Sequence, residues 1–218
     1  MTPRSIELFF ATLQAANPQP QTELEFASVF ELLAAVLLSA QATDVGVNKA
    51  TRRLFAVANT PQRIVSLGLP ALTDHLRTIG LYRNKAKNLM RTCEILLTEH
   101  AGKVPRSREA LEALPGVGRK TANVVLNVAY GEPTQPVDTH VFRVSNRTGL
   151  AAGTTPLAVE QGLNERVPPA FRVGAHHWLI LHGRYVCTAR SPKCDECPVS
   201  HCCDAFGASG SAGVANAA

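Results

Sequence analysis

The stretch Leu114-Pro115-Gly116-Val117-Gly118-Arg119-Lys120-Thr121-Ala122 separates two helical patterns and is the part of the sequence that decides the fold. The pattern before it predicts a helix over residues 108–114, and the pattern after it predicts another over residues 120–130. The glycines at positions 116 and 118 permit positive φ angles and leave backbone amides uncovered by side chains. The sequence therefore predicts two helices joined by a short hairpin.

The uncovered amides of this hairpin point to a ligand. Together with the free N–H groups that open the second helix, they form a concavity suited to a phosphate oxygen. An ordinary turn between helices also favours Pro and Gly, but the basic residues that follow favour a helix-hairpin-helix clamp on the DNA backbone, over about residues 108–130. Phosphate contacts fix position and carry no base specificity. The candidate contacts are Gly116, Val117, Gly118 and Arg119.

Most of the remaining chain also predicts helices, because apolar residues recur at spacings of three and four. No segment alternates convincingly with the period of two that is typical of strands, so the expected fold class is all-α. The further helices are expected over residues 5–16, 28–39, 44–57, from 61, 69–79, 84–100, 139–148, 156–167 and 172–187.

The composition bounds the class of protein and its partners. The 218 residues are 45% hydrophobic and 18% charged, which excludes wholesale disorder and allows a sizeable core. The longest apolar stretch, residues 30–40, is too short to cross a bilayer, and no export signal opens the chain, so we expect a soluble cytoplasmic protein with no membrane partner. The net charge of +5 and a basic run from Arg77 to Arg91 favour a polyanionic partner, although such a run also suits a solvated helix face.

Two residues have the character of catalytic groups. Lys120 falls in the first turn of the second hairpin helix, where the helix dipole disfavours a cation and Arg119 adds like-charge repulsion. The position favours the neutral amine that a Schiff-base nucleophile needs, although Lys120 equally suits a phosphate ligand. Asp138 precedes an apolar-periodic segment, as a helix N-cap does, and its carboxylate can also accept a proton or stabilise positive charge on a sugar.

Five of the six cysteines lie within 17 residues near the C-terminal end. Clustered thiols without an export signal indicate a metal or iron–sulfur site rather than a disulfide framework. The spacing of Cys187, Cys194, Cys197 and Cys203 favours a [4Fe–4S] cluster over tetrahedral zinc, with Cys202 as a competitor of Cys203 for the fourth position. Arg190 and Lys193, in the first loop of this segment, are candidates for phosphate contacts.

These motifs together resemble one family. The hairpin stretch, then Val137-Asp138-Thr139-His140, then Cys-x6-Cys-x2-Cys-x5-Cys follow the order of the endonuclease III family of bacterial DNA glycosylases. Residues 37–44, with the letters LLSAQATD, and residues 176–185 are also similar to that family. The resemblance covers about residues 6–203 and leaves only the Ala-, Gly- and Ser-rich tail outside.

The resemblance implies a fold of two helical subdomains with a cleft between them. A six-helix barrel over residues 21–132 would contain the helix-hairpin-helix, and residues 1–20 together with 133–204 would form an iron–sulfur cluster domain. The tail over residues 205–218 is expected to be a disordered extension.

The resemblance also implies a base-excision repair enzyme, a bifunctional DNA glycosylase and AP lyase that acts on damaged double-stranded DNA. Such an enzyme releases oxidised pyrimidines and cleaves 3′ to the abasic site by β-elimination through a lysine Schiff base. Lys120 and Asp138 would then be catalytic, and Cys187, Cys194, Cys197 and Cys203 would hold the [4Fe–4S] cluster. Gln41 and Leu81 match residues that fill the gap left by a flipped base, although a solvated side chain and core packing are the plainer interpretations.

Other functions stay open on the sequence. A monofunctional mismatch-adenine glycosylase resembles the same scaffold but lacks the hairpin lysine. A non-catalytic helix-hairpin-helix module would bind DNA without base release, and a ferredoxin-like electron carrier would suit the cysteines but not the hairpin. We expect the chain to be a monomer associated with the nucleoid.

Overall fold

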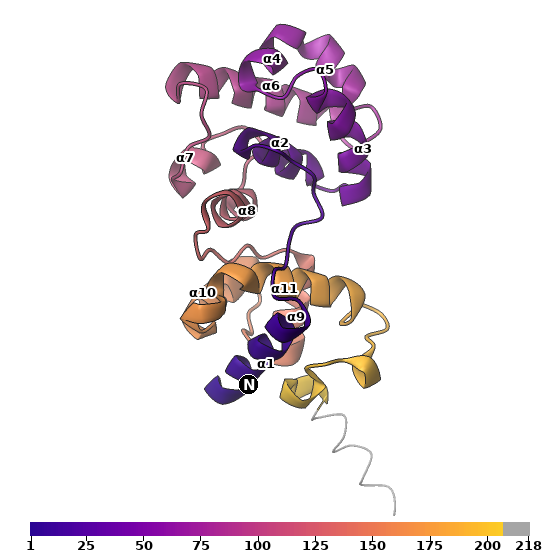
Figure 1. Cartoon of the computed structure of the whole chain (residues 1–218), viewed down its shortest axis with the longest axis vertical. Coiled ribbons are helices and arrows are strands. Elements are labelled where there is room, and N and C mark those ends of the chain that lie inside the picture. The colour runs from indigo at the N-terminus through magenta and orange to yellow at the C-terminus, as the bar shows by residue number, and fades with distance from the viewer. Residues whose placement is uncertain (207–218) are drawn as a thin grey trace, which may run out of the picture. The chain divides into compact units, whose positions relative to one another are not determined.

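The computed structural model describes residues 1–206, which contain eleven α-helices, three 3-10 helices and no strand (Figure 1). This confirms the all-α prediction. The expected disordered tail over residues 205–218 lies outside the described residues from 207 onward. Within residues 1–206, no helix is both long and apolar enough to cross a membrane.

Most helices begin where a short polar side chain can cap them. A Ser, Thr or Asp oxygen accepts a backbone N–H in the first turn, which satisfies one of the donors that a helix start leaves unpaired. At Ser28 the cap is reinforced, because Glu31 accepts the N–H of Ala27 at 2.6 Å. The capped helices are α1 (Pro3–Ala16), α2 (Val29–Ser39), α3 (Asp44–Phe55), α4 (Pro61–Leu67), α7 (Arg108–Glu112), α9 (Thr139–Thr148) and α10 (Pro156–Arg166).

The structure shifts the bounds of several expected helices. The helix expected over 69–79 is α5 (Leu69–His75), after which the chain makes turns through residue 79. The helix expected over 172–187 is α11 (Arg172–Tyr185), and the one expected over 84–100 is α6 (Tyr82–Glu99). The start of α6 shifts because Leu81, in the left-handed region at φ 58°, is its N-cap and orders the turn that follows.

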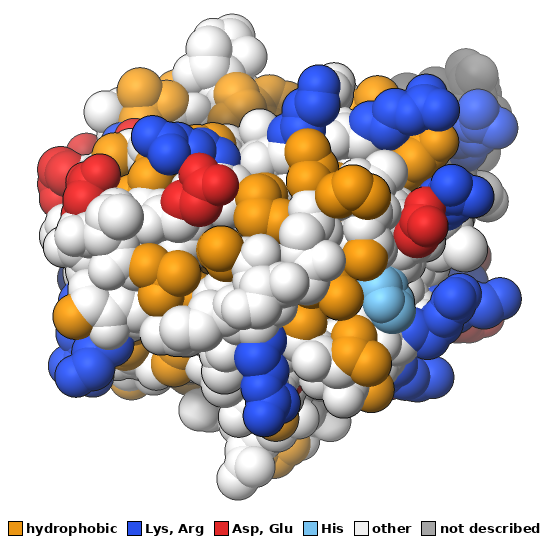
Figure 2. Space-filling model, turned by 90° about the horizontal axis from the view of Figure 1, so that it is seen from above, with side chains coloured by type: hydrophobic (Ala, Val, Ile, Leu, Met, Phe, Trp, Pro, Cys, Tyr) orange, Lys and Arg blue, Asp and Glu red, His pale blue; other side chains and the backbone are white. Residues whose placement is uncertain are grey.

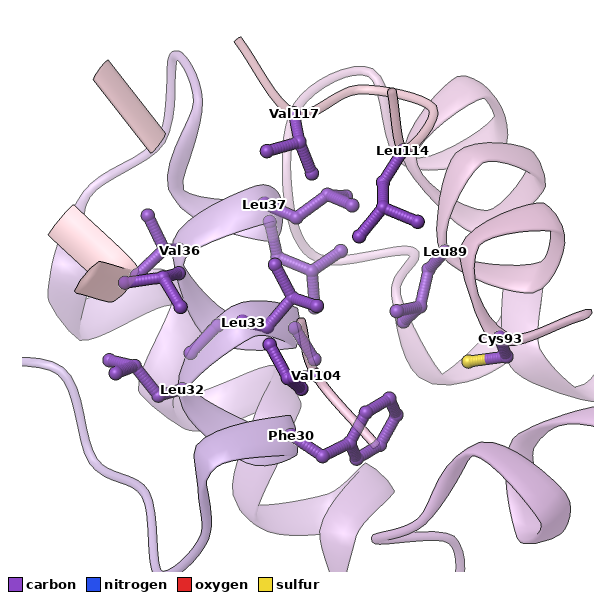
Figure 3. Close-up of a cluster of buried hydrophobic side chains, with 14 of the residues drawn as sticks. Phe30, Leu32, Leu33, Val36, Leu37, Leu89, Cys93, Val104, Leu114 and Val117 are labelled. Atoms are coloured by element: carbon purple, nitrogen blue, oxygen red, sulfur yellow. The ribbon is translucent and has the colours of Figure 1, made fainter. Parts of the chain in front are cut away.

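The chain divides into two compact units, each with its own core, and the first of them is Thr22–Glu132. Its centre is α2, which is buried along nearly its whole length and packs against α3, α6 and α8 (Arg119–Tyr130). An all-round apolar helix such as this needs neighbours on every side. The hairpin that precedes α8 is anchored here, because Leu114 and Val117 are buried around Leu37 and Leu89 (Figure 3).

The other unit is discontinuous and joins Met1–Gln21 to Pro133–Ala218. Its apolar core combines α1 with α9, α10, α11 and the segment that carries the clustered cysteines. The ring of Phe10 stacks on Phe171 at 5.8 Å between centroids, and Trp178 Nε1 donates a hydrogen bond of 2.8 Å to the carbonyl of Asn17. These contacts fasten the N-terminal helix to residues more than 150 positions away.

Candidate functional site

The hairpin between α7 and α8 engages backbone carbonyls in hydrogen bonds and leaves two amides free. Val117 N donates to Leu114 O at 3.0 Å, and the carbonyl of Gly118 accepts Ala122 N at 2.9 Å. The N–H groups of Gly116 and Gly118 have no acceptor among the described residues, and both glycines are exposed. Free amides two residues apart at a helix N-terminus suit a phosphate oxygen, as the sequence predicts.

Gly116 is required by this geometry for two independent reasons. Its φ of +80° lies in the left-handed region, which strains any residue with a side chain. A Cβ placed there would also lie 2.8 Å from Nδ2 of Asn88 in α6. The tight turn therefore depends on Gly at this position.

Lys120 is the second residue of α8 and follows the exposed Arg119. The residue is half-buried. This position suits a nucleophile as well as a phosphate ligand.

Asp138 is the N-cap of α9 in the other unit. Its Oδ1 accepts hydrogen bonds from His140 N at 2.9 Å and Val141 N at 2.8 Å. Oδ2 accepts none from the described residues, and the side chain is half-buried. One carboxylate oxygen thus fixes the group in place while the other is available for chemistry.

Gln41 and Leu81 share an unusual backbone conformation. Their φ angles are 55° and 58°, a region that residues with side chains rarely adopt. Leu81 is 58% exposed and Gln41 is exposed too, so packing inside the core does not account for either. The two loops are adjacent, because a Cβ on Gly80 would lie 3.7 Å from the carbonyl oxygen of Gln41. Strain of this kind is typical of functional loops.

Four cysteines line one cavity of about 360 Å³ near the end of the described chain. They are Cys187, Cys194, Cys197 and Cys203, whereas Cys202 is buried in the apolar core. Within residues 1–206, no three His, Cys, Asp or Glu side chains converge on a point that one metal ion could occupy. Sulfurs spread around a cavity suit a polynuclear iron–sulfur cluster better than a single zinc ion.

The charges around this cavity support the same group. Burial raises the pKa of the Cys197 thiol, and the neighbouring cysteines add to that shift. A thiolate at Cys197 is therefore unfavourable unless a cation neutralises it, which the irons of a cluster would do. His182 lies beside Cys197, with Nε2 3.8 Å from Sγ, and its burial lowers the pKa of the imidazole to about 4.

Helix α9 holds the cysteine loop through two arginines that the sequence reasoning missed. Arg147 donates to the carbonyls of Thr188 at 2.7 Å and Ala189 at 3.1 Å, and its Nη1 lies 3.5 Å from Cys187 Sγ. Arg143, one turn earlier, donates to the carbonyl of Cys187 at 3.1 Å. Their spacing of four on one helix face was the only available signal, and it does not name the partner.

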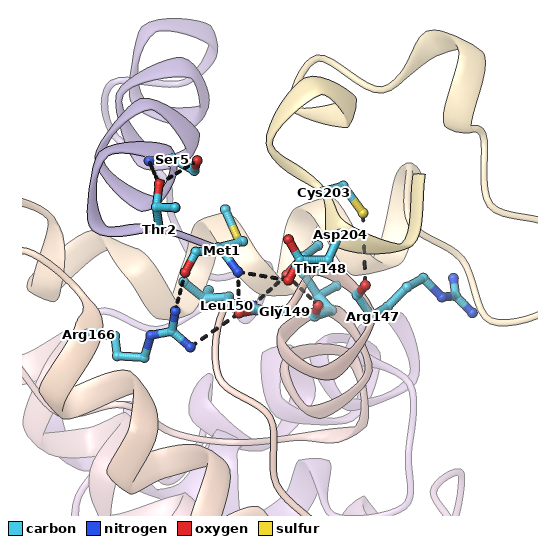
Figure 4. Close-up of polar contacts among 11 residues, drawn as sticks. Met1, Thr2, Ser5, Arg147, Thr148, Gly149, Leu150, Arg166, Cys203 and Asp204 are labelled. Carbon is cyan, nitrogen blue, oxygen red and sulfur yellow. Dashed lines mark hydrogen bonds and ion pairs between the residues drawn. The ribbon is translucent and has the colours of Figure 1, made fainter. Parts of the chain in front are cut away.

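The end of the cysteine loop is tied to the start of the chain (Figure 4). The amino group of Met1 donates to the carboxylate of Asp204 at 2.7 Å, and Arg166 donates to the carbonyl of Gly149 at 3.3 Å. A Cβ on Gly149 would lie 1.8 Å from Asp204 Oδ2, and Asp204 directly follows Cys203. These contacts restrain the last cysteine of the cavity.

The basic run from Arg77 to Arg91 is largely occupied within the protein. Lys85 is buried, while Arg190 and Lys193 of the cysteine loop are exposed. On the face drawn in Figure 2, basic side chains lie in separate groups rather than in one stripe. The contacts in the run are Arg77 with Asp74 at 2.8 Å, Arg91 with Glu94 at 2.9 Å, and Arg83 over the ring of Tyr82 at 5.1 Å.

The geometry brings some predicted residues together and keeps others in separate units. The hairpin groups its amides with Lys120, the strained loops pair Gln41 with Leu81, and the cavity groups the four cysteines. Lys120 belongs to the unit Thr22–Glu132, and Asp138 belongs to the other unit.

Two family models match the chain. Residues 34–169 match the HhH-GPD superfamily of base excision DNA repair proteins, and residues 187–203 match the iron–sulfur binding domain of endonuclease III. Curated relatives include endonuclease III of Haemophilus influenzae and of Escherichia coli K12, each 59% identical over 192 residues, with 88% of this chain and 91% of the relative covered. Endonuclease III of Treponema pallidum is 52% identical over 200 residues, 92% and 95% of the two chains.

Comparison with solved structures points to the same family. The chain is similar to a trapped endonuclease III–DNA covalent intermediate, with a TM-score of 0.89, 44% identity and coverage of 96% and 99%. It is similar to a non-covalent endonuclease III–DNA complex, with a TM-score of 0.89, 43% identity and coverage of 97% and 99%. A thermostable thymine-DNA glycosylase, 22% identical with a TM-score of 0.84 over 94% and 98%, shares the fold.

Proposed function

Because the chain belongs to the endonuclease III family of helix-hairpin-helix base-excision repair proteins, we propose that it is a bifunctional DNA glycosylase and AP lyase. Its substrate is damaged double-stranded DNA, from which it releases oxidised pyrimidines. The observation that carries the proposal is a lysine in the first turn behind a hairpin with two free amides.

Binding begins at the DNA backbone. The amides of Gly116 and Gly118 hold a phosphate, with Val117 as the buried anchor between them and Arg119 beside them. Arg190 and Lys193 add phosphate contacts from the cysteine loop. Gln41 and Leu81 enter the gap that the flipped base leaves, which explains why strained residues are exposed there.

The chemistry then follows from two side chains. The amine of Lys120 attacks C1′ of the sugar, the bond to the base breaks, and the base leaves with the electron pair and takes up a proton. Asp138 accepts a proton from the amine and stabilises positive charge on the sugar through its unoccupied oxygen. The Schiff base acidifies the C2′ proton, whose loss expels the 3′ phosphate, and water finally releases Lys120.

Residues 187–203 bind an iron–sulfur cluster, and we propose that Cys187, Cys194, Cys197 and Cys203 are the ligands of a [4Fe–4S] centre. The cluster cross-links the cysteine loop, and base release and strand cleavage need no electron from it. Arg143 and Arg147 hold the loop to α9, so its basic side chains keep a defined place.

All of these groups lie on one chain, so we propose that the enzyme acts as a monomer, and that it works at the nucleoid, where its substrate is. Light scattering during size-exclusion chromatography would reveal a dimer if one forms.

The direct test of the proposed function is borohydride trapping on a duplex that carries one oxidised pyrimidine. The wild-type protein should release the base, cut the strand and form a covalent adduct, whereas Lys120→Ala should lose the adduct and strand cleavage while still binding the duplex. A protein that releases base without an adduct would be monofunctional. Binding without base release would instead indicate a non-catalytic module, and an adduct that persists in Lys120→Ala would exclude this lysine as the nucleophile.

A further inference from the structure

Helix α6 reaches the hairpin through two polar side chains that lie one turn apart. Thr92 is fully buried, and its Oγ1 donates a hydrogen bond of 3.2 Å to the carbonyl oxygen of Pro115. Asn88 lies against Gly116, so closely that a Cβ on that glycine would meet its side-chain atoms at 2.8 to 3.3 Å. The hairpin is therefore held from α6 as well as by its own apolar anchors.

The bond to Thr92 determines which way one of the free amides points. The peptide between Pro115 and Gly116 is trans, like every other peptide of the described chain, so its C=O and N–H point in opposite directions. Because the C=O is directed at Thr92 in α6, the N–H of Gly116 is directed away from α6, on the exposed side of the hairpin. A hydroxyl 23 residues earlier in the chain thus orients the amide.

Without that hydroxyl the peptide would have reason to rotate. A half-buried carbonyl that loses its partner is unfavourable, and a glycine at the next position offers little resistance to a change of backbone angles. Rotation of the peptide would turn a carbonyl oxygen, which repels phosphate, toward the place where the N–H was.

We propose that Thr92 is a positioning residue for DNA-backbone binding, which fixes the 115–116 peptide so that the Gly116 amide faces a phosphate, with Asn88 as the side chain that keeps Gly116 in place. This inference rests on the proposed function, because it assumes that the hairpin binds DNA. It adds a residue outside the hairpin that sets the geometry of the site.

The test compares variants in the affinity for a duplex that carries a tetrahydrofuran abasic analogue, measured over a series of KCl concentrations. Thr92→Val keeps the shape of the side chain and removes the hydroxyl, whereas Thr92→Ser keeps the hydroxyl. Thr51→Val is the matched control, because Thr51 is equally buried and its hydroxyl bonds only to carbonyls of its own helix, α3.

Thr92→Val should bind about tenfold more weakly at every KCl concentration, the usual loss of one hydrogen bond to a charged group, while the slope of log K against log salt stays as in the wild type because the amide is uncharged and releases no counterion. Thr92→Ser and Thr51→Val should keep the wild-type affinity. A wild-type affinity in Thr92→Val, or an equal loss of affinity in Thr51→Val, would overturn the inference.

A second measurement needs no variant that might fail to fold. In the free wild-type protein, the amide hydrogens of Gly116 and Gly118 should exchange rapidly and that of Val117 slowly, and the duplex should protect both glycines. Protection of Gly116 in the free protein would overturn the orientation that we infer. Failure of the proposed function is recognised separately, since the wild-type protein would then give no borohydride adduct whatever the affinities show.

Discussion

Lys85 is a charged residue in an apolar setting, one turn after the strained Leu81. Its side chain is 5% exposed, and among the described residues its Nζ has no hydrogen-bond or ion-pair partner. Burial lowers the pKa of this amine below its ordinary value of 10.5, because the charged form loses more hydration than the neutral form. The folded protein therefore carries an uncompensated cost at neutral pH.

Lys85→Met should stabilise the protein at pH 7 by roughly 1–3 kcal/mol, the usual cost of an unpaired buried polar group. Between the lowered pKa of the folded state and 10.5 the unfolded chain binds more protons, so the wild-type free energy of unfolding rises with pH and the advantage of Met shrinks. Urea unfolding at pH 7 and pH 10 measures both effects. Lys87→Met, at an exposed position two residues on, is the control and should change little. A less stable Lys85→Met at pH 7 would mean that the ammonium has a favourable role in the fold.

The role of a residue could be predicted from the sequence where it follows from neighbouring residues, but not where it depends on a contact with a distant part of the chain. Lys120 and Asp138 stand out because their place at a helix start has a chemical meaning that can be argued from neighbouring letters alone. Thr92 gives no such sign, since a threonine inside a helical pattern is usually a packing residue. Its importance comes from a contact across 23 positions that only the folded chain reveals.

At the scale of elements, the start of α9 carries two functions on one side chain. Asp138 caps the helix with Oδ1 and leaves Oδ2 for the proposed chemistry. Asn is an equally good N-cap, but its amide cannot take up a proton as a carboxylate does. The two functions can therefore be separated by substitution.

Asp138→Asn should keep the wild-type melting temperature within about a degree while base release slows by roughly 10²- to 10⁴-fold, the usual contribution of general acid–base catalysis. Asp138→Ala should slow base release similarly and also lose roughly 0.5–2 kcal/mol of stability with the cap. Single-turnover base release and thermal unfolding, measured on the same preparations, test both. If Asn at this position left base release intact, the carboxylate would be only a cap.

Helix starts were more predictable than helix ends. Thr60 before Pro61 and Thr155 before Pro156 mark their starts in the sequence, because a capping oxygen and a preset φ are local features. Residues 76–79 continue an apolar spacing, yet they form turns after α5, since two of them pack into the core through backbone that is not helical. Tertiary packing at residues 76–79 therefore prevails over the helical spacing of their apolar residues.

At the scale of the whole molecule, the chain leaves the discontinuous unit after residue 21 and returns to it at residue 133. The amphipathic pattern of α1 cannot say which part of the chain it joins, because its apolar face suits any apolar surface. The stacking of Phe10 on Phe171 and the bond from Trp178 to Asn17 decide it. Since each unit has its own core, a structural cofactor bound in one unit should mainly stabilise that unit.

Loss of the cluster should unfold the discontinuous unit and leave Thr22–Glu132 protected, because the four cavity cysteines all lie in the former and each unit has its own apolar core. Hydrogen exchange of the full chain, followed by mass spectrometry of its peptides, gives the measurement. Cys203→Ser should lose the cluster absorbance and speed exchange in α9 and α11 while α2 and α8 stay protected. Cys202→Ala is the matched control, since the thiol of Cys202 lies in the apolar core rather than on the cavity, and this variant should keep the cluster. Equal loss of protection in both units would show instead that they unfold as one, and loss of the cluster in Cys202→Ala would reverse the proposed ligand.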